Sequence, residues 1–163
     1  MDAPTRAGLP HAVLFACAQN SVRSPMAAAM FRRLFGQMSY ARSAGARKGE
    51  ADPFAVAVMD EIGIDISGHV SKTLEPFLGE AFSWLITVCD QAKESCPTIP
   101  GVAQQAHWSI DDPSAVEGDE EARLAAFRQA RDILRDRIHI FILAAGRDDF
   151  PHPEPQRVGP APD

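Results

Sequence analysis

The feature that most constrains the fold is a repeated alternation of short apolar runs with helix-forming segments. The first run, AVLFACA over residues 12–18, is apolar throughout, as expected of a strand buried on both faces. Further strands are predicted over residues 39–45, 84–89 and 105–110. This alternation predicts an α/β fold: a single three-layer domain built on a four-stranded parallel sheet, with helices on both faces.

The first two predicted helices share a start signal, a capping residue followed by proline. Ser24 is the expected N-cap of a helix that runs to about Phe35. Asp52 is the expected N-cap of a second helix, which ends near Gly63.

A third helix is predicted near the end of the chain. Its inner face consists of apolar residues that recur at helical spacing: Leu124, Phe127, Leu134, Ile138 and Phe141. Acidic residues precede it and basic residues follow, an order that complements the helix dipole. The basic residues are expected on a solvated outer face: Arg128, Arg131, Arg135 and Arg137.

The chain has 163 residues, of which 45% are hydrophobic, and this suits one domain. We assign residues 1–10 to a flexible N-terminus, 11–145 to the domain, and 146–163 to a proline-rich flexible tail. A net charge of -6 argues against a nucleic-acid partner. With neither a signal peptide nor an apolar run of about 20 residues, we expect a cytoplasmic protein with no membrane contact.

In parallel sheets ligands bind at the carboxyl ends of the strands, which directs attention to the residues found there. Those residues are Cys17, Ser43, Cys89 and the turn around Asp112. Three cysteines in a chain without an export signal are not expected to form a structural disulfide framework.

The segment CAQNSVRSP places Cys17 at the end of the first strand and Arg23 at the start of a helix. A thiol attacks as its thiolate, a form that a helix N-terminus and a cation both favour. Backbone N–H groups of such a loop can cradle an oxyanion, and a guanidinium adds a two-point clamp. The expected oxyanion-binding residues are Ala18, Gln19, Asn20, Ser21, Val22, Arg23 and Ser24.

Three polar residues are expected to support this loop. Ser24 is placed to donate a hydrogen bond to the thiolate, Asn20 to brace the loop internally, and Ser43 to support it from the second strand. Each is equally compatible with a simple role as a cap or turn residue.

The sequence resembles the low-molecular-weight protein-tyrosine-phosphatase superfamily, and within it the arsenate reductases coupled to thioredoxin. The resemblance covers residues 12–141. It rests on the motifs CAQNSVRSPMA, SAG, GIDISGH, VCDQAKESCP, HWSIDDP and EEARLAAFRQARD.

The resemblance implies that Cys17 is the nucleophile, Arg23 the oxyanion binder and Asp112 the general acid. It further implies that Cys89 and Cys96 are the two resolving thiols, so that all three cysteines are catalytic. The implied activity is reduction of arsenate to arsenite, with the resulting disulfide reduced by thioredoxin or a similar dithiol.

The chain departs from the family pattern at several positions. Gln19 stands where the family usually has glycine. Some of these reductases hold potassium beside the loop, and Val70 and Lys72 occupy two of its ligand positions here. We therefore predict neither a bound metal nor a cofactor, with the Lys72 ammonium in the place of the ion. His69 and His107 are expected to be structural.

Two alternatives remain open. The first is a protein-tyrosine phosphatase or phosphomonoesterase that uses the same Cys17, Arg23 and Asp112. Against it, DDPSA and SAGARKGE offer no aromatic wall for phosphotyrosine, and Cys89 and Cys96 would have no role. The second is a non-enzymatic redox or oxyanion sensor that binds a partner through its tail.

Overall fold

The structure is a computed structural model that describes residues 12–36, 40–46, 49–77, 82–89, 102 and 104–146. The predicted N-terminal segment, nearly all of the predicted tail, and Cys96 lie outside the described residues. The predicted domain boundaries therefore stay a prediction. Within the described ranges, no helix is both long and apolar enough to cross a membrane.

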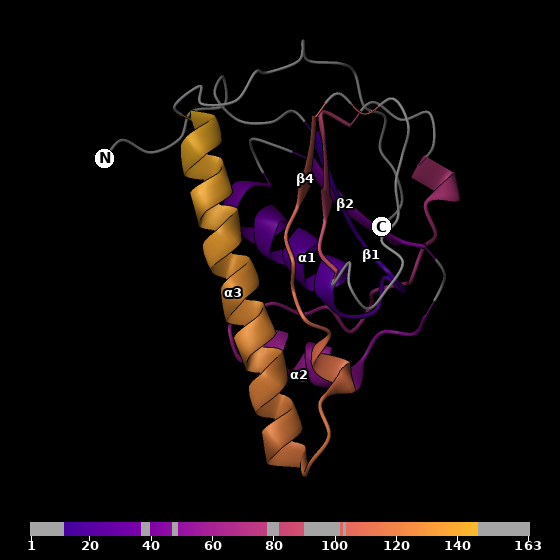
Figure 1. The fold of residues 1–163 in the computed structure, drawn as a ribbon, viewed down its shortest axis with the longest axis vertical. Helices are drawn as coiled ribbons and strands as arrows, with labels where there is room; N and C mark the ends of the chain where they lie inside the picture. The colour runs from indigo at the N-terminus through magenta and orange to yellow at the C-terminus, as the bar shows by residue number, and fades with distance from the viewer. Residues whose placement is uncertain are drawn as a thin grey trace.

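The centre of the molecule is a four-stranded sheet, as predicted. Its strands are β1 (Ala12–Cys17), β2 (Tyr40–Gly45), β3 (Trp84–Thr87) and β4 (Gln104–His107). They lie in the order β2-β1-β3-β4, and every neighbouring pair is parallel (Figure 1). Strand β1 is buried along its whole length because it is an inner strand. Its carboxyl end, which carries Cys17, therefore lies between those of β2 and β3.

Among the described residues, three α-helices accompany the sheet: α1 (Arg23–Phe35), α2 (Pro53–Asp60) and α3 (Glu120–Gly146). Figure 1 shows α3 as a long helix that runs along the sheet beside α1. One apolar cluster joins these helices to one face of β1 through Phe15, Phe31 and Phe127. On the other face, the described residues form a smaller cluster that includes Leu14 and Phe77, the latter from the 3-10 helix η2 (Glu75–Phe77).

Several predicted boundaries are displaced by a few residues. Strand β3 ends at Thr87 rather than 89, and β4 spans Gln104–His107 rather than 105–110. Helix α2 ends at Asp60, and the chain then turns through Gly63, whose φ of 80° is left-handed. Its predicted N-cap is confirmed, since Asp52 Oδ1 accepts a hydrogen bond from the N–H of Phe54 at 2.8 Å.

The predicted N-cap of α1 is wrong. The helix begins at Arg23 with Val22 in the capping position, and no side-chain cap bond is made there. Ser24 lies inside the first turn, where its hydroxyl has different partners, described below.

The inner face of α3 is confirmed, but one of its arginines is not solvated as predicted. Arg131 is buried, and its Nη1 donates to the Val58 carbonyl and to Glu61 Oε1, both at 2.8 Å. Arg128 also binds Glu61, with Nη2 2.9 Å from Oε2. Hydrogen bonds from Arg128 and then from Arg131 lower the pKa of Glu61. These bonds join α3 to the end of α2.

Neighbouring residues on α3 allow a matched test of this packing. Leu134 is fully buried in the main core, whereas Ile133 is 40% exposed. Replacing Leu134 with alanine should lower the free energy of unfolding by about 2–5 kcal/mol, because it removes buried contacts and leaves a cavity. Ile133→Ala should cost much less. Urea denaturation measures both, and equal losses would contradict the assigned inner face.

Candidate active site

The loop between β1 and α1 is held in shape by Asn20. Its φ of 53° is left-handed, a conformation that asparagine tolerates better than most residues. Its side chain is fully buried and bonded at both ends. The amide nitrogen donates to Ser24 Oγ at 2.9 Å, and Oδ1 accepts from the backbone N–H of Lys72 at 2.8 Å. The predicted internal brace is thus seen in these contacts.

Three successive carbonyl groups of the loop accept hydrogen bonds from outside it. The Gln19 carbonyl accepts from Ser71 Oγ at 2.9 Å, and the Asn20 carbonyl from His69 Nε2 at 2.9 Å. The Ser21 carbonyl accepts from the N–H of Asp52 at 3.3 Å. With its carbonyls held outward, the loop can direct N–H groups toward its centre, as an anion nest requires.

The Cys17 thiol lies at the floor of this loop. It is buried and free, and its Sγ accepts from the N–H of Asn20 at 3.3 Å. Ser24 Oγ lies 2.9 Å from the same sulfur, as predicted for a residue that supports the thiolate. The Ser24 hydroxyl also contacts the Ala44 carbonyl at 3.2 Å. The hydroxyl that was assigned to a helix cap is therefore part of the thiol's surroundings.

Arg23 and Asp112 face each other in the same pocket as Cys17. Arg23 is buried, and its Nη1 donates to the Ile110 carbonyl at 2.9 Å. Asp112 Oδ2 lies 4.0 Å from Arg23 Nη2. Its Oδ1 accepts from Ser114, from the N–H at 2.9 Å and from Oγ at 2.7 Å, which caps the 3-10 helix η3 (Pro113–Ala115). The second carboxylate oxygen therefore faces the guanidinium, whereas Asp111 is exposed.

A pocket of about 50 Å³ connects these groups. Its lining includes Ser114 and most of the predicted site: Cys17, Ala18, Gln19, Ser21, Val22, Arg23 and Asp112. Asn20 and Ser24 hold the loop from beneath instead of lining the pocket. Ser114 was missed, although a serine two residues after an aspartate is a common side-chain turn signal.

Ser43 is buried within β2 and pairs with Phe15 of β1, so it lies inside the strand rather than after it. Its neighbour Ala44 accepts the Ser24 contact. A supporting role for Ser43 stays a prediction.

The segment after α2 supplies contacts that local sequence patterns do not reveal. Ser71 Oγ accepts from the N–H of Gly49 at 3.0 Å while donating to Gln19, so it ties two loops together. Lys72 Nζ donates to the Val70 carbonyl at 3.1 Å. Ser71 is 52 residues from Gln19 in sequence, a separation that no short-range motif reports.

Both predicted structural histidines are bonded to the scaffold. His69 reaches the loop as described, and His107 Nδ1 lies 2.7 Å from Thr87 Oγ1 across β3 and β4. Within the described part of the chain, no group of three histidine, cysteine or acidic side chains is arranged to hold a metal ion.

Cys89 lies beside the nucleophile's strand. The pairing of β3 with β1 extends past Thr87, because the N–H of Val88 donates to the Ala16 carbonyl at 2.8 Å. Cys89 follows directly, is buried, and is disulfide-bonded. Two of the predicted catalytic cysteines are therefore brought to the same edge of the sheet.

Comparison with known proteins shows the family to which the chain belongs. A family model described as low molecular weight phosphotyrosine protein phosphatase matches residues 12–149. An arsenate reductase from Halalkalibacterium halodurans is 37% identical over 129 residues, which cover 79% of this chain and 93% of the relative. An arsenate reductase from Bacillus subtilis is 33% identical over 129 residues, which cover 79% of this chain and 93% of that relative. The chain belongs to the low molecular weight phosphotyrosine protein phosphatase family.

Solved structures give the same assignment of fold. An arsenate reductase in the phosphate-binding state has a TM-score of 0.69 and 28% identity, covering 83% of this chain and 98% of that one. A thioredoxin-dependent arsenate reductase from Corynebacterium glutamicum has a TM-score of 0.55 and 25% identity, covering 80% of this chain and 63% of that one.

The contacts of Asn20 generate a test in two variants. Asn20→Gly keeps the left-handed backbone accessible but removes both side-chain hydrogen bonds, so unfolding should become easier by about 1–3 kcal/mol. Asn20→Ala loses the same bonds and also strains φ, which should add about 1–2 kcal/mol. Urea denaturation should rank wild type above Asn20→Gly and Asn20→Ala last. Equal stability of the two variants would mean that the left-handed backbone is not retained.

Proposed function

We propose that the chain reduces arsenate to arsenite through a relay of three cysteines. Cys17 begins the reaction by attacking the arsenic atom, and a bond forms between Sγ and arsenic. The loop N–H groups and Arg23 stabilise the oxyanion, while Asp112 protonates the oxygen that departs as water. The facing positions of Arg23 and the free carboxylate oxygen of Asp112 support this division of roles.

The electrons for reduction come from thiols. Cys89 attacks Sγ of Cys17, the sulfur–arsenic electron pair passes to arsenic, and arsenite leaves a Cys17–Cys89 disulfide behind. Cys96 then attacks Cys89, which frees Cys17 and carries the disulfide to Cys89–Cys96. An external dithiol reduces that bond and is itself oxidised, so the enzyme returns to its starting state.

The observation that carries this proposal is the placement of two cysteines at one edge of the sheet. Cys17 is a free thiol inside an oxyanion-sized pocket, and Cys89 is buried two residues after the end of the adjoining strand β3. The arsenate reductases among the relatives support the same reaction.

The proposed reductant is thioredoxin or a similar dithiol protein. Support comes from the thioredoxin-dependent relative and from the need for two electrons in each cycle. The proposed setting is the cytoplasm, where thiols are kept reduced.

The proposed role of Asp112 as general acid can be tested by comparing its variant with a variant of the adjacent Asp111. Asp112→Asn should slow arsenate turnover by about 10²–10⁴-fold, because an amide cannot supply the proton. The exposed Asp111 is the matched control, and Asp111→Asn should have little effect. If Asp111→Asn proves the more damaging change, the acid has been assigned to the wrong residue.

The phosphatase alternative needs only Cys17, Arg23 and Asp112. A variant of Cys89 therefore distinguishes the reductase hypothesis from the phosphatase hypothesis. Arsenate turnover with purified thioredoxin and its reductase should be detected in wild type and lost in Cys89→Ala. Hydrolysis of p-nitrophenyl phosphate, assayed in parallel, should survive in that variant. Wild-type enzyme that hydrolyses the ester without reducing arsenate would favour the phosphatase. Loss of both activities in Cys89→Ala would instead assign Cys89 a packing role.

A further inference from the structure

One oxygen of the Asp112 carboxyl group is held by a single neighbouring residue. Oδ1 accepts from the N–H of Ser114 at 2.9 Å and from the Ser114 hydroxyl at 2.7 Å. The N–H bond by itself already caps η3, so the cap does not require the hydroxyl. Ser114 also lines the pocket that contains Cys17 and Asp112. The proposed reaction gives this hydroxyl no role.

The backbone is anchored on both sides of Asp112. Before it, the Ile110 carbonyl accepts from Arg23 Nη1 at 2.9 Å, and after it Pro113 is buried. The carboxyl group can still rotate about its Cβ–Cγ bond, because this torsion is broad and roughly two-fold in aspartate. Half a turn exchanges the two oxygens. Which oxygen faces the pocket therefore depends on the contacts of the carboxyl group itself.

The two carboxyl oxygens differ in how well they can carry a proton. Protonation makes an oxygen a poorer acceptor, so a proton on Oδ1 would weaken both bonds from Ser114, which is costly. Oδ2 lies 4.0 Å from Arg23 Nη2, a separation too long for a hydrogen bond. The proton of the acid form therefore belongs on Oδ2, the oxygen that faces the guanidinium in the pocket.

We propose that the Ser114 hydroxyl is a positioning group for the general acid, holding Oδ1 so that the transferable proton stays on Oδ2. This inference rests on the proposed role of Asp112. In arsenate reduction, Oδ2 gives its proton to the oxygen that departs as water, and Asp112 becomes a carboxylate. The bonds from Ser114 then strengthen, because hydrogen bonds to an ionised group are stronger than those to a neutral one.

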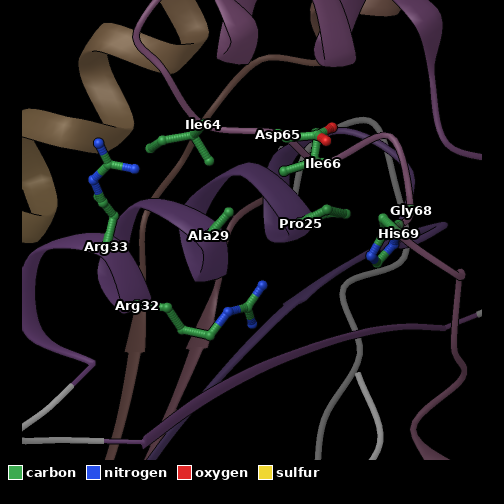
Figure 2. A pocket seen from close by; sticks show the side chains of 9 residues that line it. All are labelled: Pro25, Ala29, Arg32, Arg33, Ile64, Asp65, Ile66, Gly68 and His69. Atoms are coloured by element: carbon green, nitrogen blue, oxygen red, sulfur yellow. The ribbon is translucent and has the colours of Figure 1, made fainter.

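The chain contains a second turn of this kind outside the catalytic pocket. Asp65 Oδ1 accepts from the N–H of Ser67 at 2.8 Å, and hydrogen bonds from the Ser67 side chain and then its backbone lower the pKa of Asp65. Figure 2 shows Asp65 in a separate pocket between α1 and the segment after α2, whose lining includes neither Cys17 nor Arg23. Ser67 is therefore the matched control for Ser114.

Arsenate turnover by serine variants tests the proposal. Ser114→Ala should lower kcat/KM for arsenate by about 3–10-fold, the effect of losing one hydrogen bond. Ser114→Thr keeps the hydroxyl and should restore the activity, since Ser114 is exposed and an added methyl group has room. Ser67→Ala should change nothing. In the Asp112→Asn background, Ser114→Ala should have no further effect, because Ser114 acts only through the acid.

A pair of aryl phosphates provides a second measurement. p-Nitrophenolate leaves readily as an anion because the nitro group delocalises its charge. Phenol has a pKa of about 10, as tyrosine does, so phenolate needs the proton from the acid. Ser114→Ala should therefore lower kcat/KM for phenyl phosphate more than for p-nitrophenyl phosphate. A general disturbance of the pocket would lower both values by the same factor.

Several results would overturn the proposal. They are full activity of Ser114→Ala, an equal loss in Ser114→Thr, an equal loss in the wild-type and Asp112→Asn backgrounds, and an equal loss with the two esters. If Asp112→Asn is impaired while Ser114→Ala is not, the acid is correctly assigned and only its positioning by Ser114 is wrong. If Asp112→Asn is fully active, the assigned acid and the inference that rests on it both fail.

Discussion

The site depends on how one buried amide holds the catalytic loop. Asn20 bonds to α1 through Ser24 and to the segment after α2 through Lys72 and His69, so two separate parts of the chain fix one residue. An anion nest needs N–H groups that point inward, and carbonyls left without partners would be costly in a buried loop. The carbonyls of residues 19, 20 and 21 each accept a hydrogen bond from outside the loop, so none of the three is left without a partner. The loop is therefore preformed by its surroundings before any oxyanion arrives.

The order of the strands in the sheet determines where the other site residues, Cys89 and Asp112, lie. Because β1 is an inner strand, its carboxyl end has a neighbour on each side, and Cys89 comes from one of them. Asp112 follows β4, which does not adjoin β1. Arg23 spans that gap, since its guanidinium donates to the Ile110 carbonyl and faces the Asp112 carboxylate. One side chain thus serves the loop and holds the segment that carries the acid.

Sequence periodicity was sufficient to predict the architecture but not the side-chain contacts that hold the site. Buried β1 and the inner face of α3 follow from apolar patterns, and the residues after each strand follow from the rule for parallel sheets. The cap assigned to Ser24 was wrong because a hydroxyl near a helix start has several competing partners, and only the fold brings the Cys17 sulfur to it. Arg131 was predicted to be solvated because helical periodicity does not reveal that its guanidinium donates a hydrogen bond to the Val58 carbonyl. Ser71 could not be predicted at all, since its partner is distant in sequence.

The Ser24 hydroxyl has one proton and three polar neighbours, and this constrains how the thiolate forms. Asn20 Nδ2 donates to Ser24 Oγ, which leaves the hydroxyl proton for either the Ala44 carbonyl or Cys17 Sγ. With a neutral thiol, the S–H group can donate to Oγ while the hydroxyl donates to Ala44. Once Cys17 is a thiolate, the better acceptor is the charged sulfur, because bonds to ionised groups are stronger. The hydroxyl then turns from Ala44 to the sulfur without any movement of heavy atoms. Thiolate formation therefore exchanges a neutral hydrogen bond for a charge-assisted one, and the Asn20 N–H remains in place as a second donor to the sulfur.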